Sequence, residues 1–155
     1  MITLDASEFN KLVAEMTQVN LESNTKRQVA GVVRQASFAV EKRIKGHPPE
    51  GMPVDMGIAR ASWGHWTQQH LRGAAKTNVM QDVSVWREED DGLSITQGSN
   101  LPYIGALNDG HSRQSPAGFI DRAQLLGQLI LEEELGMIDP LSDDYQGRLY
   151  VAKFG

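Results

Sequence analysis

Four histidines and two acidic runs are the residues with the most obvious capacity for chemistry in this sequence. His65 and His70 could ligate a metal, but a spacing of five residues does not align two ligands on one helix face as a spacing of four does. The run Glu88-Glu89-Asp90-Asp91 could bind a divalent cation, although a solvated hairpin tip is the simpler interpretation. The sequence therefore predicts no metal site.

The motifs of covalent catalysis and nucleotide binding are also missing. The sequence contains no cysteine, which excludes thiol nucleophiles, thiolate zinc sites and disulfides. It has no GxSxG, HExxH, GxxxxGKS/T or GxGxxG pattern. Trp63 and Trp66, near Arg60, could stack on nucleic-acid bases, but large aromatic residues fit better as core or subunit-contact anchors. We therefore expect no catalytic residue and no cofactor.

The elements that position these residues belong to a chain of 155 residues, the length of one domain. Hydrophobic residues make up 40% of it, enough to bury a core without a disulfide or a metal. No apolar run approaches the roughly 20 residues of a membrane span, and the first residues lack the basic start and apolar stretch of a signal peptide. We therefore expect no membrane partner.

Charge is divided unevenly along the chain. Residues 1–77 hold ten Lys/Arg and seven Asp/Glu, whereas residues 78–155 hold five and thirteen. The net charge of −5 argues against a whole surface that binds duplex nucleic acid. The uneven charges could simply form solvated faces. Alternatively, the basic segment 26–45 of one copy could face an acidic segment of the next, 88–91 or 132–134, and such head-to-tail contacts close into rings.

Apolar spacing predicts a long N-terminal helix. Asp5 can cap it, and apolar residues recur at helical spacing from Phe9 to Ile44. The pattern weakens at residues 20–24, so one kinked helix and two successive helices both remain open. Pro48-Pro49 cannot continue a helix and ends the pattern.

Shorter elements follow this helix. Residues 58–66 are expected to form a strand. The Asp91-Gly92 pair after alternating β-branched residues predicts a hairpin from about residue 79 to residue 98. A helical turn is expected at 103–107, and a second helix from Gly118.

The apolar face of that second helix is expected to comprise Phe119, Ile120, Ala123, Leu126, Leu129, Ile130 and Leu135. Together these elements predict an α+β fold with a long N-terminal helix, a small, mainly antiparallel β-sheet and a second helix packed on the sheet. Residues 1–137 are assigned to this one domain, and residues 138–155 to a C-terminal extension or arm.

Three motifs occur together and in order. The first motif is Pro53-Val54-Asp55-Met56-Gly57 followed by Arg60-Ala61-Ser62-Trp63. The second motif is Ser99-Asn100-Leu101-Pro102-Tyr103 followed by Leu107-Asn108-Asp109-Gly110. The third motif is Pro116-Ala117-Gly118-Phe119-Ile120 followed by Ala123. Over about residues 52–123, this set resembles the tail-component family of long-tailed bacteriophages, whose members sit at the neck or tail-completion position between head and tail.

The resemblance implies a structural virion protein, a neck or head-tail joining component, rather than an enzyme. Copies would form a ring, expected to be hexameric, that joins head-side connector or stopper proteins to the tail terminator or tail tube. Genomic DNA would be only passing cargo in the channel of this ring. The protein would be made in the host cytoplasm and located in the virion.

The motif residues themselves suit structural roles. Asp55 before Gly57 fits a turn in which a carboxylate bonds nearby backbone N–H groups. Residues 110–118 are expected to be mobile in the isolated protein and ordered in the assembled neck, where Arg113 finds an acidic group or a DNA phosphate. The residues expected to contact a subunit or partner are Asp55, Arg60, Trp63, Tyr103, Asn108, Arg113, Phe119, Lys42, Arg43 and Lys45.

Two alternatives from other classes of protein remain open. One is a metal-dependent hydrolase that uses the histidines and the acidic clusters. The other is a DNA-binding accessory protein that uses the basic residues between 26 and 45.

Overall fold

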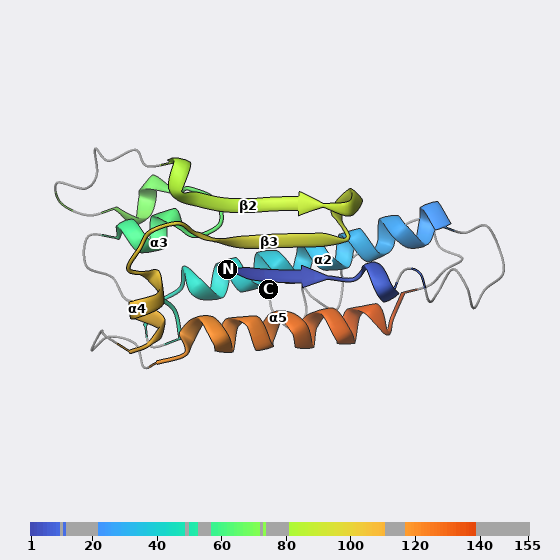
Figure 1. The fold of residues 1–155 in the computed structure, drawn as a ribbon. Coiled ribbons are helices and arrows are strands. Elements are labelled where there is room, and N and C mark those ends of the chain that lie inside the picture. Colours follow the sequence, from blue (N-terminus) through green and yellow to red (C-terminus); the bar gives the residue numbers. More distant parts are fainter. Residues whose placement is uncertain are drawn as a thin grey trace. The chain divides into compact units, whose positions relative to one another are not determined.

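The computed structural model describes residues 1–9, 11, 22–48, 50–52, 57–71, 73, 81–110 and 117–138. The helices and strands, in chain order, are β1 (Ile2–Asp5), α2 (Glu22–Ile44), α3 (Ile58–Ser62), β2 (Ser84–Glu89), β3 (Ser94–Ser99), α4 (Ile104–Asn108) and α5 (Phe119–Leu135) (Figure 1). Short 3-10 turns are η1 (Gln68–His70), η3 (Gln81–Val83) and η4 (Asp90–Gly92). Helices together with a small antiparallel sheet confirm the predicted α+β fold.

The chain divides into two compact units. Unit 1 comprises residues 1–2, 40–87 and 96–126, and unit 2 comprises residues 3–39, 88–95 and 127–155. Of the predicted arm, residues 138–155, only Ile138 belongs to the described residues. The assignment of 1–137 to a single domain stays a prediction.

The sheet has three strands in the order β1-β3-β2. β1 was not predicted, because a four-residue strand leaves too short a pattern to detect. Its burial nevertheless alternates, with Ile2 and Leu4 buried and Thr3 and Asp5 exposed, as a strand with one covered face requires. β3 is the central strand, and its residues from Ser94 to Gly98 are all buried.

β2 and β3 form the hairpin that the Asp91-Gly92 pair predicted. Its turn places Asp90 and Asp91 at φ 55° and Gly92 at φ 87°. Aspartate is one of the few residues that tolerates the left-handed region, and glycine enters it without steric conflict. The predicted span was too long at its start, because β2 begins only at Ser84.

The predicted N-terminal helix is confirmed from Glu22 to Ile44. Six of the apolar residues that recur at helical spacing in this segment are all buried: Val29, Val32, Val33, Ala36, Val40 and Ile44. Near the start of the chain, Asp5 Oδ1 accepts a 2.8 Å hydrogen bond from the backbone N–H of Ser7, as the predicted helix cap requires. Residues 10 and 12–21 lie outside the described residues, and of the stretch 20–24, where the pattern weakened, residues 22–24 belong to α2.

The strand predicted for residues 58–66 is wrong. Ile58–Ser62 is helical, and the backbone becomes extended only at Trp63, with φ −75° and ψ 130°. Ala59 and Ala61 favour a helix strongly, and Gly57 at φ 80° turns the chain into it. Both alanines are buried, so this short segment lacks the spacing of buried and exposed positions that would have distinguished a helix from a strand.

The second predicted helix is confirmed as α5, but its predicted buried face is partly wrong. Phe119, Ala123 and Ile130 are fully buried, whereas Leu129 is 63% exposed. The buried face instead continues through Leu131 and Glu134, which is only 3% exposed. The leucine spacing alone could not reveal which side of α5 is buried, because hydrophobic residues lie on more than one side of this helix. No helix in the described part of the chain is both long and apolar enough to cross a membrane.

Candidate functional site

The first two motifs are joined directly in unit 1. The hydroxyl oxygens of Ser62 and Ser99 lie 2.8 Å apart in a hydrogen bond. Beside them, the backbone N–H of Gly64 donates to the carbonyl oxygen of Gly98 at 3.0 Å. Residues more than thirty positions apart in sequence are therefore held together at the end of β3.

Asn108 joins the second motif to the third. Its carbonyl oxygen accepts a 2.7 Å hydrogen bond from the backbone N–H of Gly118. Its side-chain Oδ1 accepts a 2.9 Å bond from the N–H of Ile120, and its Nδ2 donates to Asp121 Oδ2 at 3.0 Å. We call the hydrogen-bonded set Ser62, Ser99, Asn108, Gly118 and Ile120 the motif frame.

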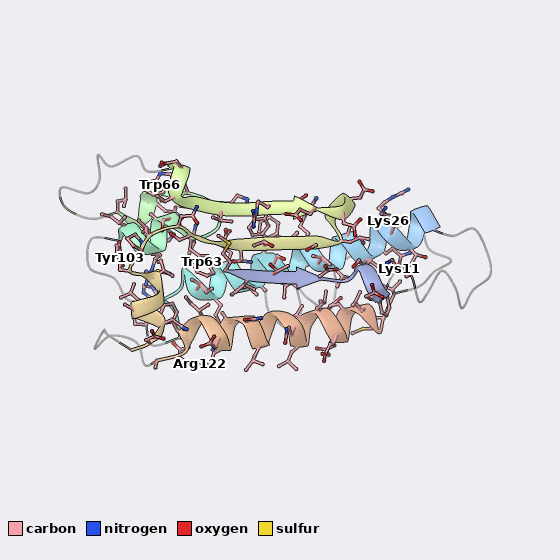
Figure 2. All side chains as sticks on the ribbon, viewed as in Figure 1. Lys11, Lys26, Trp63, Trp66, Tyr103 and Arg122 are labelled. Carbon is pink, nitrogen blue, oxygen red and sulfur yellow. The ribbon has the colours of Figure 1, made fainter. Side chains whose placement is uncertain are left out.

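The other buried motif residues hold the interior of unit 1. Trp63 is 1% exposed, and its Nε1 donates a 2.8 Å hydrogen bond to the buried Oε1 of Gln97. Arg60 is 5% exposed and donates from Nη2 to the carbonyl oxygen of Met52 at 3.0 Å. Phe119 is fully buried. Because these side chains lie in the interior, they are not on a surface that a partner could touch, contrary to the prediction for Arg60, Trp63 and Phe119. Figure 2 labels Trp63 and, nearer the surface, Trp66 and Tyr103.

A polar link ties the end of α2 to the segment after Trp63. Glu41 Oε2 accepts two hydrogen bonds from His65, one from its backbone N–H at 2.7 Å and one involving its Nδ1 at 2.9 Å. Gly64, at φ 63°, leaves room for this carboxylate, because a Cβ at that position would clash with it. The ring of His65 also lies against Trp86, with centroids 4.3 Å apart.

Lys45 strengthens the same link. Its Nζ donates to the carbonyl oxygen of His65 and to Thr67 Oγ1, which lies 3.2 Å away. Burial lowers the pKa of Lys45, and the negative charge of Glu41 partly opposes that shift. Lys45 was expected to contact a partner, but its ammonium group is engaged within its own unit.

His70 lies close to two cations. Its pKa is lowered first by burial and then by the positive charges of Lys45 and Arg60. His70 is therefore a poor metal ligand, because these two cations would repel a bound metal ion. Within the described ranges, no group of three or more His, Asp or Glu side chains is arranged to hold a metal ion.

Unit 2 brings the basic helix and the acidic hairpin tip together. Lys26 Nζ lies 2.8 Å from Asp91 Oδ2, and Arg34 Nη2 lies 3.2 Å from Glu88 Oε2. The hydrogen bond and the charge of Lys26 hold the pKa of Asp91 below its ordinary value. Opposite charges that were expected to meet between copies, segments 26–45 and 88–91, thus pair within one chain at these two points.

Comparison with known proteins gives no match. No protein-family model matches the sequence, and no curated protein or solved structure is significantly similar to it. The function of the protein must therefore be inferred from its residues and their geometry.

The remaining predicted contact residues have different placements. Lys42 is exposed, Arg43 is half-buried and Tyr103 is 42% exposed, so their contact with a partner stays a prediction. Asp55 and Arg113 lie outside the described residues.

Sequence reasoning missed the roles of Glu41 and Gln97, which bind His65 and Trp63 from distant segments. One signal was present for Asn108: Gly118 stands before α5 and has no side chain to cap it, so another residue had to supply the cap.

Proposed function

We propose that this protein is a structural component of a tailed-bacteriophage virion, in which copies form a ring at the neck around the DNA channel. The ring would join head-side connector or stopper proteins to the tail terminator or tail tube. The starting point is the resemblance of the three ordered motifs to the tail-component family. The observation that carries the proposal is the motif frame, because residues of the three motifs that resemble that family bond to one another across the sequence.

The frame supports a scaffolding role. Ser62 and Ser99 bond to each other, and Asn108 bonds to the first turn of α5. Their polar atoms therefore fix the backbone of unit 1 instead of facing a substrate. A ring component needs such a fixed shape, because every copy must present the same two complementary surfaces, one to each neighbour.

The test is the state of assembly of the full chain. We would measure its mass by size-exclusion chromatography with light scattering, and its shape by negative-stain electron microscopy, alone and with a purified head-side connector. We expect closed rings with a central opening in at least one of these two conditions.

A protein that stays monomeric in both conditions would contradict the proposal. So would stoichiometric zinc or manganese in the purified protein that is lost on changing His65 and His70, since that result favours the hydrolase alternative. Tight binding to short duplex DNA by the monomer would favour the DNA-binding alternative.

A further inference from the structure

The exposed side of α2 in unit 2 carries a basic stripe, which we define as Arg27, Arg34 and Phe38. The spacings of seven and four residues place all three on one face of the helix. Both arginines are exposed, and Phe38 is 45% exposed. The whole helix holds five basic and two acidic residues, a formal charge of +3.

The exposed side of α5 in unit 2 carries an acidic stripe, which we define as Gln128, Leu129 and Glu132. Spacings of three and four residues to Glu132 place these side chains on one face. All three are exposed, Leu129 at 63%. The whole helix holds four acidic residues and one basic residue, a formal charge of −3 that is equal and opposite to that of α2.

The C-terminal end of α5, which includes Glu132 of the acidic stripe, also breaks a local rule of helix stability. Glu132, Glu133 and Glu134 lie at this end, and the last turn contains no basic residue. The carbonyl groups there already carry partial negative charge, so an exposed acidic residue such as Glu132 is unfavourable at this position. α2 follows the rule, with Lys42 and Arg43 in its last turn. A violation of this kind is expected where a cationic partner binds.

The basic stripe remains exposed although Arg34 is paired within the chain. The Arg34 side chain keeps 55% of its surface exposed in its pair with Glu88. Exposed pairs of this kind contribute little to stability, so a second carboxylate can share or replace the partner at little cost.

We propose that the basic stripe of one copy binds the acidic stripe of a second copy of this chain. Phe38 would pack against Leu129 of the neighbour, and the two arginines would lie near its Glu132. A second copy fits because the two exposed arginines of the basic stripe and the exposed Glu132 of the acidic stripe have opposite charges, and each stripe has one exposed apolar residue. Two different surfaces in contact repeat from copy to copy and can close into a ring. In this respect the inference rests on the proposed function and specifies the contact that builds the ring.

The absence of cysteine makes a direct test possible. We would purify Phe38→Cys and Leu129→Cys separately, give one of them a longer tag, mix them in the reduced state and then oxidise them. We expect the mixed disulfide dimer to form at least about tenfold faster than any dimer of either variant alone. Arg87→Cys, an exposed position on β2 outside both stripes, serves as the matched control partner.

Two results would overturn the inference. In the first, Phe38→Cys links to itself as fast as it links to Leu129→Cys, which indicates a symmetric contact. In the second, the mixed pair forms no faster than the pair with Arg87→Cys. Binding of short duplex DNA that is lost in Arg27→Glu, in a protein that shows no specific mixed linkage, would assign the basic stripe to DNA and would also overturn the inference.

Charge reversal keeps the inference testable if Phe38→Cys folds poorly. Arg27→Glu alone and Glu132→Arg alone should each weaken self-association by roughly tenfold, because like charges then face each other. The mixture of the two variants, and the double variant, should regain the original association. Arg87→Glu makes the same charge change outside the stripes and should have no effect. If neither the mixture nor the double variant regains the original association, the proposed contact between the two stripes is wrong.

The two proposals fail in different ways. Rings that form without specific linkage between the stripes would leave the neck function standing and place the contact elsewhere. Specific linkage in a protein that forms only open chains, with or without a connector, would support the contact and contradict the neck function.

Discussion

Asn108 caps α5 from a distant position: its Oδ1 accepts a 2.9 Å hydrogen bond from the backbone N–H of Ile120, twelve residues further along the chain. Gly118, at φ 84°, has no side chain to do this itself. Asn108 therefore links the end of α4 to the start of α5 through its side chain as well as through its backbone carbonyl.

Removal of that cap should destabilise the protein. We expect Asn108→Ala to lower the free energy of unfolding by about 1–2 kcal/mol, the usual effect of losing an N-cap. Chemical denaturation at pH 7 measures this, and Asn100→Ala, a change of an exposed asparagine in the same motif, should alter stability by less than about 0.5 kcal/mol. Equal effects of the two substitutions would show that the cap is unimportant.

Asn108→Asp should behave differently with pH. It keeps an acceptor for the Ile120 N–H, but it places a second carboxylate beside Asp121. Repulsion raises the pKa of the new carboxyl group in the folded state above its unfolded value. The folded variant should therefore regain stability relative to wild type as pH falls toward about 4, and lose it as pH rises to 7. A constant difference across this range would contradict the prediction.

Two tryptophans provide a matched pair for the buried hydrogen bond. Trp63→Phe removes the donor to Gln97 Oε1 and leaves that oxygen buried, so we expect a loss of about 2–4 kcal/mol in the free energy of unfolding. Trp66→Phe should lose less, because the Nε1 of Trp66 is buried without a hydrogen-bond partner among the described residues. Denaturation followed by circular dichroism distinguishes them, and a larger loss for Trp66→Phe would refute the assignment.

The lowered pKa of His70 predicts a pH dependence of stability. Because the folded-state pKa lies below the unfolded value of 6.5, the unfolded chain takes up the proton first. The contribution of His70 is therefore complete above pH 6.5 and is lost as pH falls toward the folded-state pKa. His70→Gln should flatten this part of the stability profile, whereas His47→Gln, at an exposed position, should not. An NMR titration that places the pKa of His70 at or above 6.5 would reject the explanation.

The Lys26–Asp91 pair makes a prediction about a single carboxyl group. Lys26→Met should raise the pKa of Asp91 toward its ordinary value, because the hydrogen bond and the nearby charge are both lost. The sign follows from the lowered folded-state pKa: the stabilising contribution is present above the ordinary carboxyl value and is lost as pH falls. Carboxyl-carbon NMR titration measures the shift. Arg34→Met, which removes the neighbouring pair instead, should leave Asp91 unchanged.

The sequence predicted elements well where one periodicity extended over many residues. α2 offered six buried apolar positions at helical spacing, and the hairpin had both alternation and an Asp-Gly turn. β1 and α3 were missed or misassigned because each has four or five residues, too few for a period to emerge. In β1 and α3, burial against distant segments determines the local structure, and the sequence does not display that burial.

The candidate site was predictable only in part, for a related reason. Arg60, Trp63 and Asn108 were singled out from the motifs, but their partners lie on other segments: Met52, Gln97 and Ile120. A residue type shows what it can bond to and not which distant group the fold brings near. Hence Arg60, Trp63 and Phe119 were predicted to lie on a contact surface, although all three are buried.

The composition of the two units has a consequence for how the protein is made. Unit 1 requires residues up to 126, and unit 2 combines residues 3–39 with residues from 127 onward. A nascent chain on the ribosome therefore cannot complete either unit until α5 has been synthesised and has emerged. Contacts between such distant segments form slowly compared with local ones. Copies translated side by side thus gain the acidic stripe for association only after α5 has emerged, later than the basic stripe on α2.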